Sequence, residues 1–264
     1  MKGGPGLPSA WPWRTSATVT LYFSDGQFLF PVSRRIPAHD DLPRSILQAL
    51  LTGPSVASGL TSSLPRGVEI RSFKVAGGVA QIDLSAGERG LTQEAETAIV
   101  ETMTALSGVN SVTLSLEGKP VTDLAKRRPL LYYASANGLV AVPVADTTPR
   151  AAINTYLAGP PDPRLSGLPA DVRLLKYEYN PAAGLVSLNF SYTPSVRALA
   201  LDYPERVRFV LLGVVASLTE FAGVQAVQLD FEGRTRLGLG QCSDLLRAPQ
   251  PRPELLNDER LLGR

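Results

Sequence analysis

The two halves of the 264-residue sequence resemble each other, and this internal repeat limits the possible folds of the chain more than any other feature. Five short blocks occur in the same order in both halves, and each block keeps its pattern of apolar, glycine and proline positions. One such match would be weak evidence, whereas five in a fixed order indicate a duplicated domain. The matched blocks are 21–23 with 131–133, 50–54 with 156–160, 64–68 with 168–172, 78–85 with 184–191, and 108–118 with 223–233.

Each copy shows the same succession of hydrophobic periods. Apolar residues alternate in the expected strands and recur at spacings of three and four in the expected helices. A helix with one apolar stripe must cover a sheet or another helix. We therefore expect an α+β fold with two tandem copies of a β-β-α-β-β-α-β domain. In each copy, two helices should pack on one face of a small, mostly antiparallel sheet.

The first helix of each copy has clear start and stop signals. Pro43 and Pro149 stand at matching positions in the first turn, where a missing N–H group has little cost. Asp41 and Thr148 precede these two helices as plausible caps. Gly53 and Gly159, each followed by proline, are expected to end the two helices.

The same patterns set the expected domain boundaries. Residues 17–121 and 129–235 form the two domains, and each, at about 105 residues, is long enough to bury its own core. Residues 122–128 are expected to be a linker, and the Pro-, Arg- and Leu-rich residues 236–264 a tail of low order. Residues 1–16 are expected to be flexible. They contain no continuous apolar segment, so no signal peptide is predicted, although a truncated or mis-assigned start would also explain this.

Composition excludes several classes of function. The net charge is only +2, and the densest basic run, at 126–128, is interpreted as a solvated linker, so no nucleic-acid partner is expected. The most apolar stretch, 209–218, is far shorter than the ~20 residues of a membrane-spanning helix, and no transmembrane span is predicted. Cys242 is the one cysteine and His39 the one histidine, so we expect no intrachain disulfide, no metal site and no cofactor.

The polar residues that could suggest catalysis have simpler interpretations. His39 stands beside two aspartates, but these precede a helix, where acidic residues favour the positive end of the helix dipole. Ser85 and Ser191 recur at matched positions without a histidine base that the pattern could supply. Glu117 and Glu232 recur before glycines and indicate a turn. We therefore predict no catalytic residue.

The ordered motifs resemble the GerMN domain family. The resemblance rests on the Leu-Tyr-Phe strand at 21–23, Leu-Leu-x-Gly-Pro at 50–54, Leu-Pro-x-Gly-Val at 64–68, Asp-Leu-Ser at 83–85 and the Gly-Val to Glu-Gly segment at 108–118. It covers residues 17–121 and 129–235. The resemblance implies a fold similar to the ring-building domains of cell-envelope complexes, and no enzymatic activity.

The resemblance also implies a location and a role. GerM-like proteins are usually exported, are often tethered to the membrane as lipoproteins, and stabilise multi-protein assemblies such as the sporulation channel. This chain departs from that pattern because it shows no export signal or lipid-anchor cysteine near its start. The location is thus left open between the cell envelope, which the resemblance suggests, and other compartments.

Two classes of function fit these observations. The first is a non-catalytic protein–protein interaction or assembly module with protein partners, and a homo-oligomer is left open. The alternative is a small-ligand-binding protein or an enzyme that uses a cleft between the two domains. Polar groups converging on a deep pocket between the domains would favour the alternative, whereas a flat interface would favour the first.

The two copies differ most in one segment. The offset between matched residues is 106 at Ser191 and 115 at Phe221, so the second copy carries nine extra residues between them, within 192–203. Aromatic residues and arginines are enriched at interface hot spots. One hypothesis is that this segment binds a partner, and the other is that it folds back and closes the core of its own domain. The candidate partner-binding residues are Tyr192, Leu199, Leu201, Tyr203 and Arg206.

Overall fold

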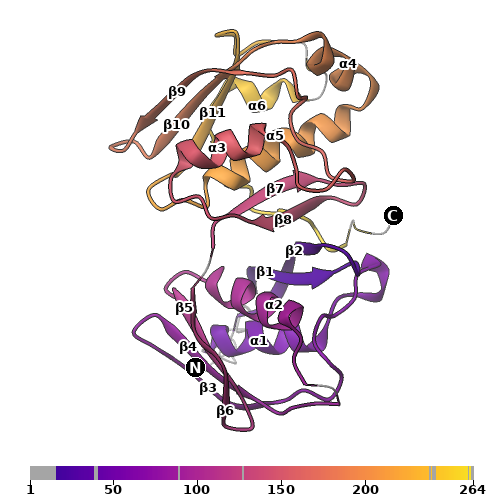
Figure 1. The fold of residues 1–264 in the computed structure, drawn as a ribbon, viewed down its shortest axis with the longest axis vertical. Coiled ribbons are helices and arrows are strands. Elements are labelled where there is room, and N and C mark those ends of the chain that lie inside the picture. Colours follow the sequence, from indigo (N-terminus) through magenta and orange to yellow (C-terminus); the bar gives the residue numbers. More distant parts are fainter. Residues whose placement is uncertain are drawn as a thin grey trace, which may run out of the picture.

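The computed structural model describes residues 16–38, 41–88, 90–126, 128–237, 239, 242–260 and 262. Two α+β repeats stand one above the other along the long axis of the molecule (Figure 1). His39 and Asp40, which were interpreted as residues preceding a helix, lie outside the described residues, as does nearly all of the expected flexible segment 1–16.

Both repeats follow the predicted succession of elements. The first repeat contains β1 (Ser16–Ser24), β2 (Leu29–Pro37), α1 (Leu42–Thr52), the short 3-10 helix η1 (Val56–Ser58), β3 (Ile70–Ala76), β4 (Val79–Leu84), α2 (Gln93–Thr104), β5 (Ser111–Leu116) and β6 (Lys119–Lys126). The second contains β7 (Leu130–Ala134), β8 (Leu139–Pro143), α3 (Pro149–Leu157), β9 (Leu174–Asn180), β10 (Leu185–Phe190), α4 (Pro194–Asp202), α5 (Pro204–Leu218), β11 (Ala226–Phe231), α6 (Asp244–Arg247) and β12 (Gln250–Pro251).

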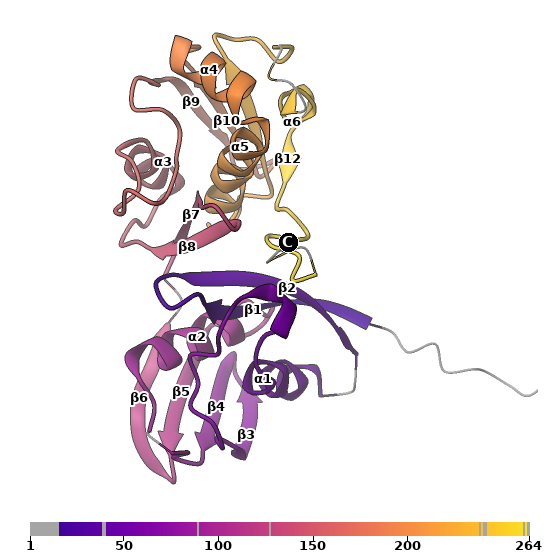
Figure 2. The ribbon, with the colours of Figure 1, turned by 90° about the vertical axis from the view of Figure 1, so that its right-hand side faces the viewer.

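Each repeat has three layers. In the first repeat, α1 and α2 lie between the antiparallel hairpin β1–β2 and a four-stranded sheet of order β3-β4-β5-β6 (Figure 2). In the second repeat, α3 and α5 lie in the same way between the hairpin β7–β8 and the sheet β12-β11-β10-β9. Within the sheets, β4–β5 and β10–β11 pair in parallel and the other pairs are antiparallel. The α+β prediction is confirmed, and the hairpins form an additional layer on the other side of the helices.

The local signals at the helix ends act as predicted. The Asp41 side chain accepts a hydrogen bond from the Arg44 amide, and Thr148 accepts one from the Ala151 amide at the matching helix. Gly53 and Gly159 have φ angles of +86° and +101°, which residues with a Cβ rarely adopt.

The long helix α5 of the second repeat is buried along most of its C-terminal half. Val214, in its centre, has no solvent-exposed surface. At Gly213 the helix approaches β7 so closely that an added Cβ would overlap the carbonyl oxygen of Tyr132. The matching residue in the first repeat is Ala98, which is also fully buried. The helix thus packs more tightly on its hairpin in the second repeat than in the first.

The linker expected at 122–128 is mostly strand. Residues 119–126 form β6, in which Ala125 pairs with Val112 and Lys126 with Ser111. The backbone groups along β5 need partners, and β6 supplies them. The connection between the repeats is therefore shorter than the composition suggested.

The tail is also more regular than expected. Its β12 pairs antiparallel with β11, and the pair Val227–Gln250 occupies the place that Val112–Ala125 holds in the first repeat. β12 thus completes the second sheet as β6 completes the first. Beyond it, residues 252–260 pass between the two repeats (Figure 2). The low order expected for 236–264 is corrected for these residues, because partners distant in sequence hold them.

Candidate protein-binding surface and the seam between the repeats

The nine extra residues of the second copy build a helix and a sharp turn. The Thr193 side chain accepts a hydrogen bond from the Val196 amide and caps α4, which begins at Pro194. Pro204 begins α5, so the chain changes direction at Tyr203. Tyr192 therefore lies just before α4, and the other candidate residues lie on α4, at this turn and in the first turn of α5.

Two of the five candidate residues help to close the core of the second repeat. Tyr192 and Leu199 are partly buried and pack against the core. The Tyr192 ring stands edge-on to Phe231, with 6.2 Å between the ring centroids. On α4, Val196 and Ala200 complete the buried face. For this face, the interpretation that the segment folds back over its own sheet is the better one.

The other three candidates form an exposed cluster, which we call the α4–α5 patch: Leu201, Tyr203 and Arg206. Leu201 is 69% exposed and Tyr203 is 56% exposed. The Arg206 guanidinium lies 5.2 Å from the centroid of the Tyr203 ring, a cation–π distance that holds the aromatic ring in place. Asp202 and Glu205 are exposed beside it, so the patch combines apolar surface with both signs of charge.

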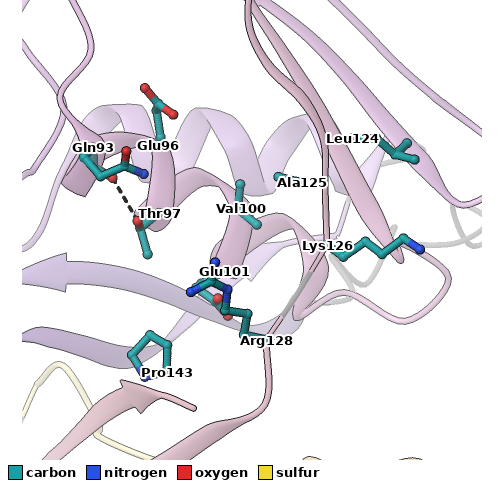
Figure 3. Close-up of a pocket in the computed structure, with 10 residues that line it drawn as sticks. All are labelled: Gln93, Glu96, Thr97, Val100, Glu101, Leu124, Ala125, Lys126, Arg128 and Pro143. Atoms are coloured by element: carbon teal, nitrogen blue, oxygen red, sulfur yellow. Dashed lines mark hydrogen bonds between the residues drawn. The ribbon is translucent and has the colours of Figure 1, made fainter. Parts of the chain in front are cut away.

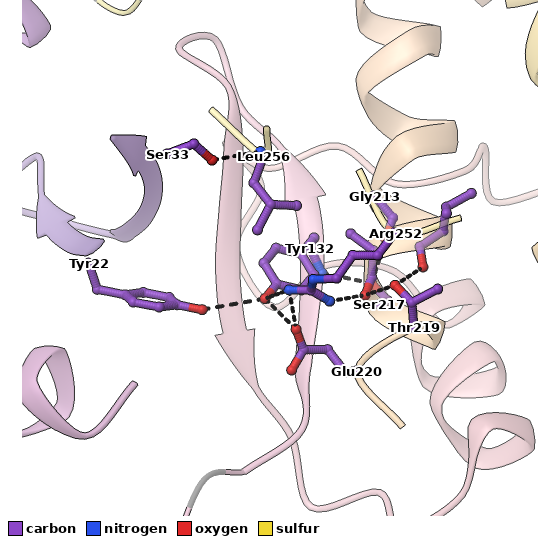
Figure 4. Close-up of polar contacts among 11 residues, drawn as sticks. Tyr22, Ser33, Tyr132, Gly213, Ser217, Thr219, Glu220, Arg252 and Leu256 are labelled. Carbon is purple, nitrogen blue, oxygen red and sulfur yellow. Dashed lines mark hydrogen bonds and ion pairs between the residues drawn. The ribbon is translucent and has the colours of Figure 1, made fainter. Parts of the chain in front are cut away.

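The seam between the repeats is built around two equivalent tyrosines (Figure 4). Tyr22 and Tyr132 occupy matched positions in β1 and β7, and their hydroxyl oxygens lie 3.4 Å apart across the seam. Their backbone amides also have matched partners. The Tyr22 amide donates to Thr102 Oγ1 at 3.1 Å, and the Tyr132 amide donates to Ser217 Oγ at 2.8 Å. The duplicated hairpins thus meet face to face with their equivalent side chains in contact.

A partly buried charge pair, Glu220 with Arg252, lies next to these tyrosines. The Tyr132 hydroxyl donates to the Glu220 carboxylate at 2.7 Å, and Arg252 Nη2 lies 2.5 Å from the same oxygen. The Glu220 side chain is only 2% exposed. Burial opposes the positive charge of Arg252, but Tyr132 and Glu220 outweigh it and raise the Arg252 pKa above its usual value. The pair is neutral as a whole and joins the tail to the second repeat.

A surface depression of about 510 Å³ lies beside the segment that joins the repeats (Figure 3). Its walls come from α2, β6, this joining segment and Pro143 at the end of β8. It is partly open, and apolar side chains such as Val100, Leu124 and Pro143 lie between its charged ones. The seam itself is filled by side chains and by the tail. This geometry favours an interface over a catalytic cleft.

The recurring serines are structural. Ser85 Oγ accepts a hydrogen bond from the Glu69 amide at 2.8 Å, and Ser191 Oγ accepts one from the Arg173 amide at 2.8 Å. Each serine amide also donates to the carbonyl of the same partner. These bonds join the segment before β3 or β9 to the end of β4 or β10 in the same way in both repeats.

The carboxylate Asp83 and its counterpart Asn189 have the same task. Their side-chain oxygens accept hydrogen bonds from the amides of Gly118 and Gly233, both at 2.9 Å. The bond from the Gly118 amide lowers the pKa of Asp83, and Ser115 and Arg71 act in the same direction against the effect of burial. This position requires a hydrogen-bond acceptor but no negative charge, which explains why the second repeat can have asparagine there. The Glu-Gly pairs are turns, as predicted, with Glu117 also at positive φ.

Within the described part of the chain, no three or more His, Cys, Asp and Glu residues gather in a way that could hold a metal ion. Among the same residues, no helix has the length and apolarity needed to cross a membrane.

Two stacked repeats of one fold, joined at matched hairpins, define a duplicated α+β domain protein. The family model described as Germane, sporulation and spore germination, matches residues 20–122 and 130–237, once in each repeat. The chain belongs to the GerMN (Germane) family. The two matches confirm both the resemblance and the duplication.

Solved structures agree with this assignment. The tandem GerMN domains of the sporulation protein GerM from Bacillus subtilis superpose with a TM-score of 0.68 at 19% identity, over 91% of this chain and 99% of that chain. The first GerMN domain of that protein covers 42% of this chain and 98% of its own length, with a TM-score of 0.36 and 18% identity. At these identities the likeness concerns the fold alone. No curated protein matches this chain.

Proposed function

We propose that this chain is a non-catalytic assembly protein that binds another protein through the α4–α5 patch. The observation that carries the proposal is the exposure of Leu201 and Tyr203 on the segment that only the second repeat possesses. Burial of two such side chains at an interface would contribute about 1.5–3 kcal/mol each. Tyr203, already stacked against Arg206, would lose little conformational freedom on binding.

The seam supports a binding role over catalysis. Its hydroxyl, carboxylate and guanidinium groups are hydrogen-bonded to one another, and none of Tyr132, Glu220 and Arg252 lines one of the described depressions. The resemblance to GerM-like proteins, which stabilise assemblies of the cell envelope, points in the same direction. We extend that role to this chain, with a protein as the partner.

The test is recovery of crosslinked partners from the source organism. We expect the double variant Leu201→Ser/Tyr203→Ser to lose partners that the wild-type chain recovers, at an unchanged melting temperature. Val56→Ser is the matched control, because Val56 is fully exposed in the first repeat. Equal recovery by the double variant and the control would contradict the proposal. If the partner is a second copy, light scattering will show a dimer that the double variant lacks.

A further inference from the structure

Segment 255–260 of the tail lies against Ser33, the middle residue of β2. Asp258 forms a parallel bridge with Ser33, and the polar groups of Ser33 all face the tail. The Ser33 amide donates to the Asn257 carbonyl at 2.7 Å, the Leu256 amide donates to Ser33 Oγ at 3.1 Å, and the Glu259 amide approaches the Ser33 carbonyl at 3.5 Å. The first repeat thus binds the tail along the edge of β2 through one β-bridge, which is a short form of the strand addition seen in peptide recognition.

The side chain of Asn257 contacts both repeats at once. Its Nδ2 donates to the Pro31 carbonyl of β2 and to the Leu139 carbonyl of β8, each at 2.8 Å. Its Oδ1 accepts a hydrogen bond from the Leu139 amide at 2.8 Å. Asn257 is only 4% exposed. A carboxylate in its place would face two carbonyl oxygens without a donor, so the geometry selects an amide.

Glu259 adds a second specific contact. Arg34 Nε donates to Glu259 Oε2 at 2.7 Å and Arg34 Nη2 to Oε1 at 2.5 Å, a bidentate pair. The Ser55 amide donates to the same carboxylate at 2.6 Å. Arg34 is held from behind, because it also donates to the carbonyls of Ala49 and Gly53 at the end of α1.

Apolar anchors flank these polar contacts. Leu256 is 6% exposed and packs in one cluster with Tyr22, Tyr132 and Leu139 from both repeats. The receiving surface also fits the tail at Gly138, in the turn between β7 and β8, where an added Cβ would overlap Asn257 Oδ1. The site thus has a strand edge, an amide pocket, an anion pocket and an apolar pocket in a fixed order.

We propose that the seam between the repeats is a binding site for an extended peptide of the pattern Leu-Asn-x-Glu, and that its ligand is the chain's own segment 256–259. Seating of this segment fixes one repeat against the other, because Asn257 and Leu256 contact both. The site is distinct from the α4–α5 patch and does not depend on the function proposed for that patch.

Because the ligand is tethered, a free peptide of the same sequence competes only when the chain's own segment is weakened. We would measure binding of a fluorescent peptide of residues 252–264 to the full chain by fluorescence anisotropy. Asn257→Ala in the full chain should strengthen peptide binding about tenfold or more, since it raises the fraction of empty sites. A peptide carrying Asn257→Ala should not bind. A peptide carrying Arg260→Ala should bind like the wild type, because Arg260 is exposed and, among the described residues, its side chain bonds to Asp258 of the same segment.

A second variant guards against a folding defect. Glu259→Gln keeps the shape of the side chain and the contacts of Asn257, and it should raise peptide binding to a smaller extent. In both variants, the amides of Ser33 and Leu139 should exchange hydrogen faster, while the Tyr132 amide, bonded to Ser217, stays protected. Failure of both folded variants to bind the peptide, or equal binding of the wild-type and Asn257→Ala peptides, would overturn the proposal.

Discussion

Gly213 shows how a single atom sets the packing of the second repeat. A helix interior normally gains about 1 kcal/mol when glycine is replaced by alanine. At this position, however, the new methyl group would overlap the Tyr132 carbonyl and approach the Tyr156 hydroxyl. The tight contact between α5 and β7 should therefore reverse the usual sign.

We predict that Gly213→Ala lowers the free energy of unfolding by about 1–3 kcal/mol, the range found for overpacked cores. Urea denaturation followed by circular dichroism would measure it. Ala98→Gly, at the matching site of the first repeat, is the control and should also destabilise, because there the methyl group is already accommodated. A stabilised Gly213→Ala variant would show that the helix and hairpin are further apart.

At the same scale, the sequence placed Tyr22 and Tyr132 in matched strands but could not place them in one cluster. The duplication assigns both tyrosines to equivalent positions. Whether equivalent positions meet depends on how the repeats stack, and the partners of that stacking, Glu220 and Arg252, are far apart in sequence. No local pattern contains this information.

Among the elements, α4 divides the candidate site. Its buried face carries Leu199, and its exposed end carries Leu201. Both residues are leucines on one short helix, so they provide a matched comparison in which only burial differs.

We predict that Leu199→Ser lowers the free energy of unfolding by about 1–2 kcal/mol, since part of a leucine side chain leaves the core. Leu201→Ser should change it by less than about 0.5 kcal/mol, as is usual for exposed sites. Thermal and urea denaturation would measure both. Equal effects of the two variants would show that Leu201 is also part of the core.

The elements that local signals control could be predicted, and the others could not. Capping side chains, prolines and glycines determine α1 and α3, and alternation determines the β9–β10 hairpin. The additional helix α4 was predicted only as extra chain. The tail has Pro251 and Pro253 and no apolar period, so its sequence is typical of a linker. Its order comes from Ser33 and Leu139, which lie more than a hundred residues away in the chain.

For the whole molecule, the tail should make stability depend on pH. Burial and the nearby Asp258 act to raise the pKa of Glu259. The hydrogen bonds from Arg34 and the Ser55 amide lower it more strongly, so the pKa lies below its usual value of 4.5. A carboxylate with a lowered folded-state pKa stabilises fully above its unfolded pKa. This stabilisation is lost as the pH falls below about 4.5 and through the lowered folded-state value.

We therefore predict that the wild-type chain loses more stability than Glu259→Gln as the pH falls from about 5 towards about 3, because this range includes the usual Glu259 pKa of 4.5. At pH 7 the wild type should be the more stable of the two. Unfolding in urea at each pH would give the difference. Parallel curves for the two chains would contradict a charged contact between Glu259 and Arg34.

The paired tyrosines and the Asn257 side chain should hold the two repeats in one fixed arrangement. Gln48 and Asn154 are exposed and occupy matched positions on α1 and α3, so cysteines there can carry spin labels, while the native Cys242 is fully buried. Double electron–electron resonance would give the distance distribution between the labels. We expect a single narrow distribution of label distances in the wild-type chain and a broader one in the Asn257→Ala variant. A broad distribution in the wild-type chain would contradict this fixed arrangement.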